Sequence, residues 1–175
     1  MTILVLDVGT SGLKAAAVRP DATVAAERRV ELLPDTPFPG LVEFDARRMA
    51  DACRAVADAV LAEVGPVDAV GITNQRASTV VWDPATGEPV GPALGWQDLR
   101  TVGTCLALQA EGIRVGPNAT ATKAAHLLDE HDPDRSRGLR VGTVESWLTW
   151  VLSEGEAHVT DASNAGVTGL SRHDR

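Results

Sequence analysis

The sequence predicts an α/β domain whose sheet begins with a β-hairpin. Three short apolar runs, at residues 2–7, 13–18 and 23–30, are separated by segments rich in Gly, Ser, Pro and Asp, which is typical of strands joined by turns. A helix-length stretch at 45–64 and a further apolar run at 67–72 follow. This alternation of strands and helices is the pattern of α/β proteins.

The first two strands are expected to form the hairpin. Residues 2–7 form a short apolar run, the pattern of a strand buried on both faces, and Gly9–Gly12 supplies a turn before residues 13–18. A turn at 20–22 leads to the third strand, residues 23–30. Three prolines between residues 34 and 39 then predict an irregular, extended loop.

Asp45 opens the clearest helix, because its carboxylate can cap free backbone N–H groups. The helix is expected to run to about residue 64, with one apolar stripe formed by Met49, Cys53, Val56, Val60 and Val64. Gly65 and Pro66 end it, and residues 67–72 form the fourth strand. Beyond this we expect short strands at 79–82 and 141–144 and helices at 100–111, 122–130 and 146–152.

Composition restricts the class of protein. Sixteen basic and 24 acidic residues give a net charge of −8, which argues against a nucleic-acid surface. No apolar run approaches the roughly 18 residues of a membrane span, and the amino terminus lacks the basic start of a signal peptide. Cys53 and Cys105 lack metal-like spacing. We therefore expect a cytoplasmic protein with two buried thiols.

The turn between the first two strands is the first candidate site. Its glycines permit positive φ and close approach of an anion, its hydroxyls donate, its lysine adds positive charge and its aspartate can hold hydrated magnesium. These residues are Asp7, Gly9, Thr10, Ser11, Gly12 and Lys14. The alternative is a tight hairpin that uses Gly, Thr and Ser for turn geometry alone. The chain has neither a Walker A motif nor a Gly-x-Gly-x-x-Gly fingerprint.

Two later segments are candidates for substrate binding. Arg76 follows the end of the fourth strand, where α/β sheets usually place their sites, and it could donate to substrate hydroxyls; the alternative is a surface arginine that bridges a loop. Trp96 could form a flat apolar wall, with Gln97 and Asp98 as polar neighbours. The alternative is a core tryptophan beside a capping aspartate.

Taken together and in order, these segments resemble the amino-terminal half of the FGGY carbohydrate kinases, and within that family the glycerol kinases. The resemblance covers residues 2 to about 171. The segments that carry it are Asp7–Lys14, Gly71–Arg76, Val80–Asp83, Thr86–Gly87, Trp96–Thr101, Gly142–Leu148 and His158–Ala165.

The resemblance implies a ribonuclease H-like, actin-like fold with a mixed sheet, and transfer of the γ-phosphoryl group of ATP to a hydroxyl of a polyol or sugar. Asp7 would match the aspartate associated with Mg²⁺ through water, and Gly9, Thr10, Ser11 and Lys14 the phosphate-contacting loop. Arg76 and Trp96 would match residues that line the polyol site.

Two positions depart from the glycerol kinase pattern. Those kinases follow the arginine with a substrate-binding glutamate, where this chain has Ala77. The run Gly116–Lys123 resembles one that carries a substrate-binding tyrosine, where this chain has Asn118. Asn118 can both donate and accept hydrogen bonds, so the departures favour a different or larger polyol or sugar over glycerol.

The family's general base belongs to a Gly-Asp-Gln-type motif that residues 1–175 do not contain, and we expect this base beyond Arg175. We therefore expect residues 1–175 to be an amino-terminal domain truncated before that aspartate, without the adenosine-binding second domain. The isolated chain should be inactive, with no catalytic base, a missing carboxy-terminal kinase half as its partner and a tendency to self-associate. The alternatives are a non-catalytic fragment that binds a ligand or partner, and a fragment with no function of its own.

Overall fold

The computed structural model describes residues 1–171, and these divide into two compact units. The first unit comprises Met1–Leu33 and Arg47–Gln75. The second comprises Pro34–Ala46 and the chain from Arg76 onward.

The first unit contains a four-stranded mixed sheet in the order β3-β2-β1-β5. Strands β1 (Ile3–Val8) and β2 (Gly12–Val18) form the expected antiparallel hairpin. Strand β3 (Val24–Glu31) extends it on one side, and β5 (Ala69–Asn74) pairs parallel to β1 on the other. All four strands begin and end within about two residues of the predicted positions.

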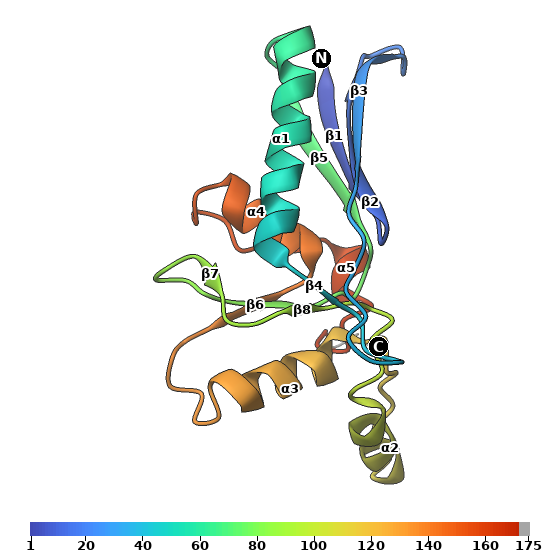
Figure 1. Cartoon of the computed structure of the whole chain (residues 1–175), viewed down its shortest axis with the longest axis vertical. Coiled ribbons are helices and arrows are strands. Elements are labelled where there is room, and N and C mark those ends of the chain that lie inside the picture. The colour runs from blue at the N-terminus through green and yellow to red at the C-terminus, as the bar shows by residue number, and fades with distance from the viewer. Residues whose placement is uncertain (172–175) are drawn as a thin grey trace. The chain divides into compact units, whose positions relative to one another are not determined.

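Helix α1 (Ala46–Val64) covers one face of this sheet (Figure 1). It begins directly after Asp45, as expected, and four members of the predicted stripe are buried: Met49, Cys53, Val56 and Val60. The sheet residues that alternate toward this face are also buried: Leu4, Leu6, Val8, Leu13, Ala15, Ala17 and Ala26. Arg28 of β3 joins this face to the helix through a 2.7 Å bond to Glu63.

Strand β5 lies at the edge of the sheet. Among the described residues its only strand partner is β1, and Val70 is 53% exposed. A parallel strand is usually buried on both sides. This edge therefore presents backbone N–H and C=O groups without a neighbouring strand in residues 1–171.

The second unit contains two small sheets. Strands β7 (Glu88–Pro89), β6 (Val80–Asp83) and β9 (Arg140–Gly142) form an antiparallel sheet in that order. Strands β4 (Glu43–Phe44) and β8 (Ala93–Leu94) form a two-stranded sheet. A buried cluster of Val81, Leu94 and Leu127 packs β6 and β8 against α3 (Thr120–His131).

The remaining helices are α2 (Val102–Ala110), α4 (Val144–Leu152) and α5 (Ala162–Ala165). The expected strand at 141–144 is wrong at its end, because β9 stops at Gly142 and Val144 already begins α4. The two-residue strands β4, β7 and β8 were not predicted, since two residues are too few to show a periodicity. Trp82 and Trp147 are buried edge to face with ring centroids 5.4 Å apart.

Two sequence expectations concern the whole described chain. Cys53 and Cys105 are free and buried, as expected. Within residues 1–171 no helix combines the length and apolar character required to cross a membrane.

Candidate functional site

The turn between β1 and β2 is closed by a backbone bond from Gly9 N to Gly12 O of 2.9 Å. Neither glycine has a positive φ, so that expected reason for the glycines is wrong. Gly12 is required by close approach instead, because a Cβ there would lie 2.6 Å from Val30 O on β3. The turn is thus shaped by the packing of β2 against β3.

Strand register brings charged side chains together beside this turn. Asp7 lies opposite Lys14 across β1 and β2, and Lys14 lies opposite Arg29 across β2 and β3. Side chains paired in this way share one face of a sheet. This is the face opposite α1, so the three charged groups are not covered by that helix.

A cavity of about 270 Å³ opens at this place. Its lining residues are Asp7, Gly9, Ser11, Gly12, Leu13, Lys14, Glu27 and Arg29. Five of the six residues named for the phosphate loop therefore line one cavity. Thr10 belongs to the same turn but is not part of the lining.

Sequence reasoning missed Glu27 and Arg29. Lys14 Nζ lies 3.8 Å from Glu27 Oε2, and both side chains are nearly half exposed, so this ion pair contributes little to stability. An anion entering the cavity could therefore replace Glu27 as the partner of Lys14 at a small cost in free energy, and it would also meet Arg29. Alternation along the third strand could have predicted that Glu27 and Arg29 share one face of the sheet. It could not have predicted which face that is.

The cavity fits a magnesium–polyphosphate group. Lys14 and Arg29 supply positive charge, and Ser11 supplies a hydroxyl donor. Mg²⁺ in phosphate sites is usually held by one or two carboxylates, phosphate oxygens and water, which matches the presence of Asp7 and Glu27. Among the residues that the structure describes, no cluster of three or more metal-ligating side chains offers a protein-only cage.

Arg76 and Ala77 begin the longer of the two stretches of chain that form the second unit. The Arg76 side chain is exposed, which fits a substrate-binding arginine and a surface arginine equally. Ala77 is buried with a left-handed φ of 65°, which costs a residue with a Cβ about 1–2 kcal/mol. Thr120 Oγ1 donates to Ala77 O over 3.2 Å, and this bond ties the segment to the first turn of α3.

Trp96 is 39% exposed, so the alternative of a core tryptophan is wrong. Its backbone N–H donates to Ser78 Oγ over 3.0 Å. Just before it, Gly95 N donates to Val42 O over 2.8 Å, and a Cβ on Gly95 would lie 2.8 Å from Val42 Cγ1. The backbone is therefore fixed on both sides while the indole remains accessible.

Asp98 is fully buried and acts as a brace for this loop. It accepts from Arg100 Nε over 2.8 Å and from Val42 N over 2.7 Å, and Arg100 also bonds Glu43 over 2.6 Å. Burial alone would raise the pKa of Asp98, but the hydrogen bonds from Arg100 and Val42 lower it below its usual value. Asp98 is therefore a buried carboxylate whose oxygens are held by Arg100 and by the Val42 backbone.

Asn118 is exposed just before the first turn of α3. Its Oδ1 lies over Gly116, where a Cβ would be only 2.7 Å from that oxygen. Ala77, Trp96 and Asn118 thus lie on segments that are connected through α3, because Thr120 contacts Ala77 and Lys123 contacts the carbonyls of Trp96 and Pro117.

The expected general base has no counterpart in the described part of the site. Its position is expected beyond Arg175, and Arg175 itself lies outside residues 1–171, which the structure describes. The location of the base therefore stays a prediction. What the structure describes are the candidates for phosphate binding in the first unit and for substrate binding in the second.

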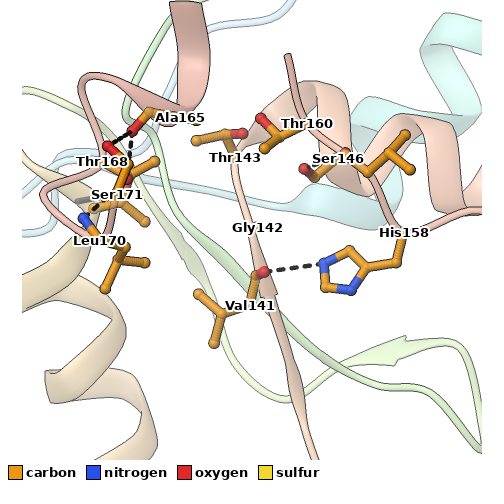
Figure 2. A pocket seen from close by; sticks show the side chains of 12 residues that line it. Val141, Gly142, Thr143, Ser146, His158, Thr160, Ala165, Thr168, Leu170 and Ser171 are labelled. Atoms are coloured by element: carbon orange, nitrogen blue, oxygen red, sulfur yellow. Dashed lines mark hydrogen bonds between the residues drawn. The ribbon is translucent and has the colours of Figure 1, made fainter. Parts of the chain in front are cut away.

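A larger cavity of about 340 Å³ in the second unit contains none of the predicted site residues (Figure 2). It lies between β9, the start of α4 and the segment around α5. Its hydroxyls donate inside the protein: Ser146 to Val159 O, Thr168 and Ser171 to Ala165 O, and Thr160 to Glu145. The cavity therefore offers methyl groups and acceptor oxygens, which suit a phosphate poorly.

Comparison with known proteins agrees with the fold. The family model for the FGGY family of carbohydrate kinases, N-terminal domain, matches residues 2–172. The chain is 40% identical over 179 residues to a glycerol kinase of Gloeobacter violaceus, covering 96% of this chain and 36% of that protein. For a glycerol kinase of Xanthobacter autotrophicus the identity is 41% over 186 residues, covering 96% and 37%.

Solved structures show the same fold. The glycerol kinase of Plasmodium falciparum, determined with ADP, superposes with a TM-score of 0.84 at 22% identity and covers 97% of this chain and 37% of its own. A xylulose kinase from Rhodospirillum rubrum gives the same TM-score, identity and coverage. The fold is that of an actin-like ATPase domain. The chain belongs to the FGGY family of carbohydrate kinases, and it spans about 37% of the length of the relatives it matches.

Proposed function

We propose that residues 1–175 are the amino-terminal domain of an ATP-dependent kinase that phosphorylates a hydroxyl of a polyol or sugar. The observation that carries the proposal is the cavity at the β1–β2 turn, where Asp7, Lys14 and Arg29 share one face of the sheet. Its charges suit a nucleotide polyphosphate. Family membership supports the same interpretation.

The first unit would bind the phosphates. Lys14 and Arg29 would contact phosphate oxygens, and the hydroxyls of Thr10 and Ser11 would donate at the turn. Asp7 would orient hydrated Mg²⁺, which when bound neutralises charge on the phosphates as the γ-phosphoryl group moves. These residues would position the donor, and phosphoryl transfer depends on positioning together with electrostatic stabilisation.

The second unit would bind the acceptor. Trp96 would place an apolar ring against the carbon chain, Arg76 would donate to hydroxyls, and Asn118 would both donate and accept. Ala77 offers no side-chain hydrogen bond, so one hydroxyl contact of the glycerol kinase pattern is lost. A larger polyol or a sugar, with more hydroxyls for Arg76 and Asn118, therefore suits these acceptor-binding residues better than glycerol.

The remainder of the kinase would supply the general base, beyond Arg175, and the adenosine-binding domain. Residues 1–175 contain no Gly-Asp-Gln motif, and the matched relatives are almost three times as long as the matched region. The carboxy-terminal kinase half would be the partner of these residues. A non-catalytic domain that only binds its ligand is the alternative.

Two measurements test the proposal. Calorimetry should detect binding of Mg·ADP to residues 1–175, and Asp7→Asn should weaken it. A chimera that joins these residues to the rest of the Gloeobacter violaceus glycerol kinase should transfer phosphate from ATP to a polyol or sugar. Binding without transfer by a folded chimera would favour the non-catalytic alternative. The absence of both binding and transfer would refute the proposal.

A further inference from the structure

Lys123, in the first turn of α3, is one of only two lysines in the chain and is fully buried. A buried ammonium group is costly unless its N–H donors are satisfied. Its Nζ donates to Pro117 O over 2.7 Å and makes longer contacts of 3.5 Å with Trp96 O and Ala119 O. Three donors therefore meet three backbone carbonyls.

These carbonyls belong to the two segments that carry the proposed acceptor-binding side chains. One is the carbonyl of Trp96 itself. The other two, from Pro117 and Ala119, lie on either side of Asn118 in the chain. A single buried group thus joins the backbone at Trp96 to the backbone at Asn118, although the two residues are distant in sequence.

Within residues 1–171, the charged surroundings do not provide Lys123 with a counter-ion of its own. Burial lowers the pKa of Lys123 to about 8, and the charges of Asp98 and Cys105 only partly oppose this. Asp98 is already paired with Arg100. An apolar side chain of similar size would avoid the cost of burying a charge, so the carbonyl contacts are the feature that requires a lysine here.

We propose that Lys123 is a positioning residue, whose buried ammonium fixes Trp96 and Asn118 relative to each other and so determines how tightly a polyhydroxylated acceptor is held. The proposal rests on the function proposed above for Trp96 and Asn118. Lys123 itself is fully buried and does not touch the acceptor. Its removal should therefore affect acceptor affinity without removing any group that contacts the acceptor.

The first test measures backbone order and needs no ligand. Lys123→Met keeps most of the volume and removes the donors. We expect amide hydrogen exchange at Trp96 and Ala119, whose N–H groups donate to Ser78 Oγ and Gly116 O, to become at least tenfold faster in this variant. The control is Leu127→Ala, which leaves a cavity beside the same helix but removes no hydrogen-bond donor. In this control, exchange at these amides should not increase more than exchange elsewhere in the second unit. Unchanged exchange in a folded Lys123→Met would overturn the proposal.

A measurement on the unaltered chain covers the case in which Lys123→Met does not fold. With two lysines, ¹³Cε-lysine spectra give two signals, and that of Lys123 can be followed between pH 7 and 9. The backbone signals of Trp96 and Asn118 should shift with the same midpoint as the Lys123 signal. Cys105 and Asp98 also face this group, so in Cys105→Ala the backbone signals must still shift with the midpoint of the Lys123 signal. Backbone signals that do not follow the lysine would overturn the proposal.

The second test measures acceptor binding, with glycerol and D-xylulose as probes followed at the Trp96 indole and Asn118 amide signals. Lys123→Met should raise the dissociation constant about tenfold, and Leu127→Ala should leave it within twofold. An equal loss in both variants would overturn the positioning role. If neither probe shifts these signals in the unaltered chain, the proposed acceptor-binding function of Trp96 and Asn118 fails. The exchange experiment still decides whether Lys123 orders the backbone at these two residues.

Discussion

Lys14 and Arg29 lie directly opposite each other on β2 and β3, and both line the cavity at the β1–β2 turn. The neighbouring Arg28 points to the other face of the sheet, where it bonds Glu63 of α1. Two consecutive arginines thus point to opposite faces of the sheet, and only Arg29 can serve an anion bound at the turn.

This relationship gives a matched pair of variants. Arg29→Ala should weaken binding of Mg·ADP to residues 1–175 about tenfold, because a charge-assisted hydrogen bond to phosphate contributes roughly 1.5–3 kcal/mol and this site is partly screened by water. Arg28→Ala removes the same charge from the opposite face and should change affinity less than twofold. Calorimetry on both variants measures their affinity for Mg·ADP. Equal losses of affinity would mean that only the net charge of the chain matters and would contradict a site at the turn.

Residues 1–175 by themselves should not phosphorylate any polyol or sugar at a useful rate. Phosphoryl transfer needs an oriented nucleophile and a closed site as well as bound phosphate, and the chain spans about 37% of its matched relatives. A coupled assay of ADP release over a panel of polyols and sugars measures this. Magnesium-dependent turnover that is abolished by Asp7→Ala would contradict the prediction.

Acceptor preference should depend on positions 77 and 118. In a complete kinase that carries this chain, Ala77→Glu with Asn118→Tyr should move the preference toward glycerol, because a site built to bond a hydroxyl discriminates strongly for it. The backbone at 77 is already left-handed with an alanine, so glutamate adds no new backbone constraint there. The ratio of kcat/KM for glycerol to that for longer polyols is the measurement. A parent enzyme that already prefers glycerol would contradict the idea.

Burial of Cys53 in α1 should make stability depend on alkaline pH. Burial raises the pKa of this thiol from 9.0 to about 11, so between these values the unfolded chain loses a proton that the folded chain keeps. The stabilisation is complete below pH 9 and is lost as the pH rises through 11, by up to about 2–3 kcal/mol.

Urea unfolding at pH 8, 9, 10 and 11 measures this loss, with Cys53→Ala as the control. Lys123 acts in the opposite direction, since its lowered pKa makes stability rise between about pH 8 and its unfolded value. That contribution is common to both proteins and cancels in their difference. The unaltered chain should lose its advantage over Cys53→Ala as the pH rises, and a constant difference would exclude the thiol as the cause.

The exposed edge of β5 should cause residues 1–175 to self-associate, because an edge without a neighbouring strand can pair with another chain. Sedimentation at several concentrations measures this. Val70→Lys places a charge on β5 and should shift the distribution toward monomer. Val24→Lys places the same charge on β3, the opposite edge strand, and a smaller effect there would assign the association to the edge of β5. A compact monomer with one cooperative melting transition would contradict the prediction.

Much of the first unit could be predicted from the sequence. Apolar runs of strand length, the Gly-Thr-Ser-Gly turn and the stripe of α1 are local patterns, and they gave four strands and one helix close to their observed bounds. The second unit was predicted less well. Strands β4, β7 and β8 have two residues each, and they form where separate segments meet, which no local pattern records.

Local sequence thus determined the hairpin, its turn residues and the segments that bear Arg76, Trp96 and Asn118. Tertiary structure alone decided which side chains share a site. A strand that shifts by one residue exchanges its two faces, so the sequence Glu27-Arg28-Arg29 does not say which arginine faces the turn until β3 pairs with β2. Lys123 is likewise an ordinary helix residue in the sequence. It becomes a buried donor only because Trp96 and Pro117 bring their carbonyls to it when the chain folds.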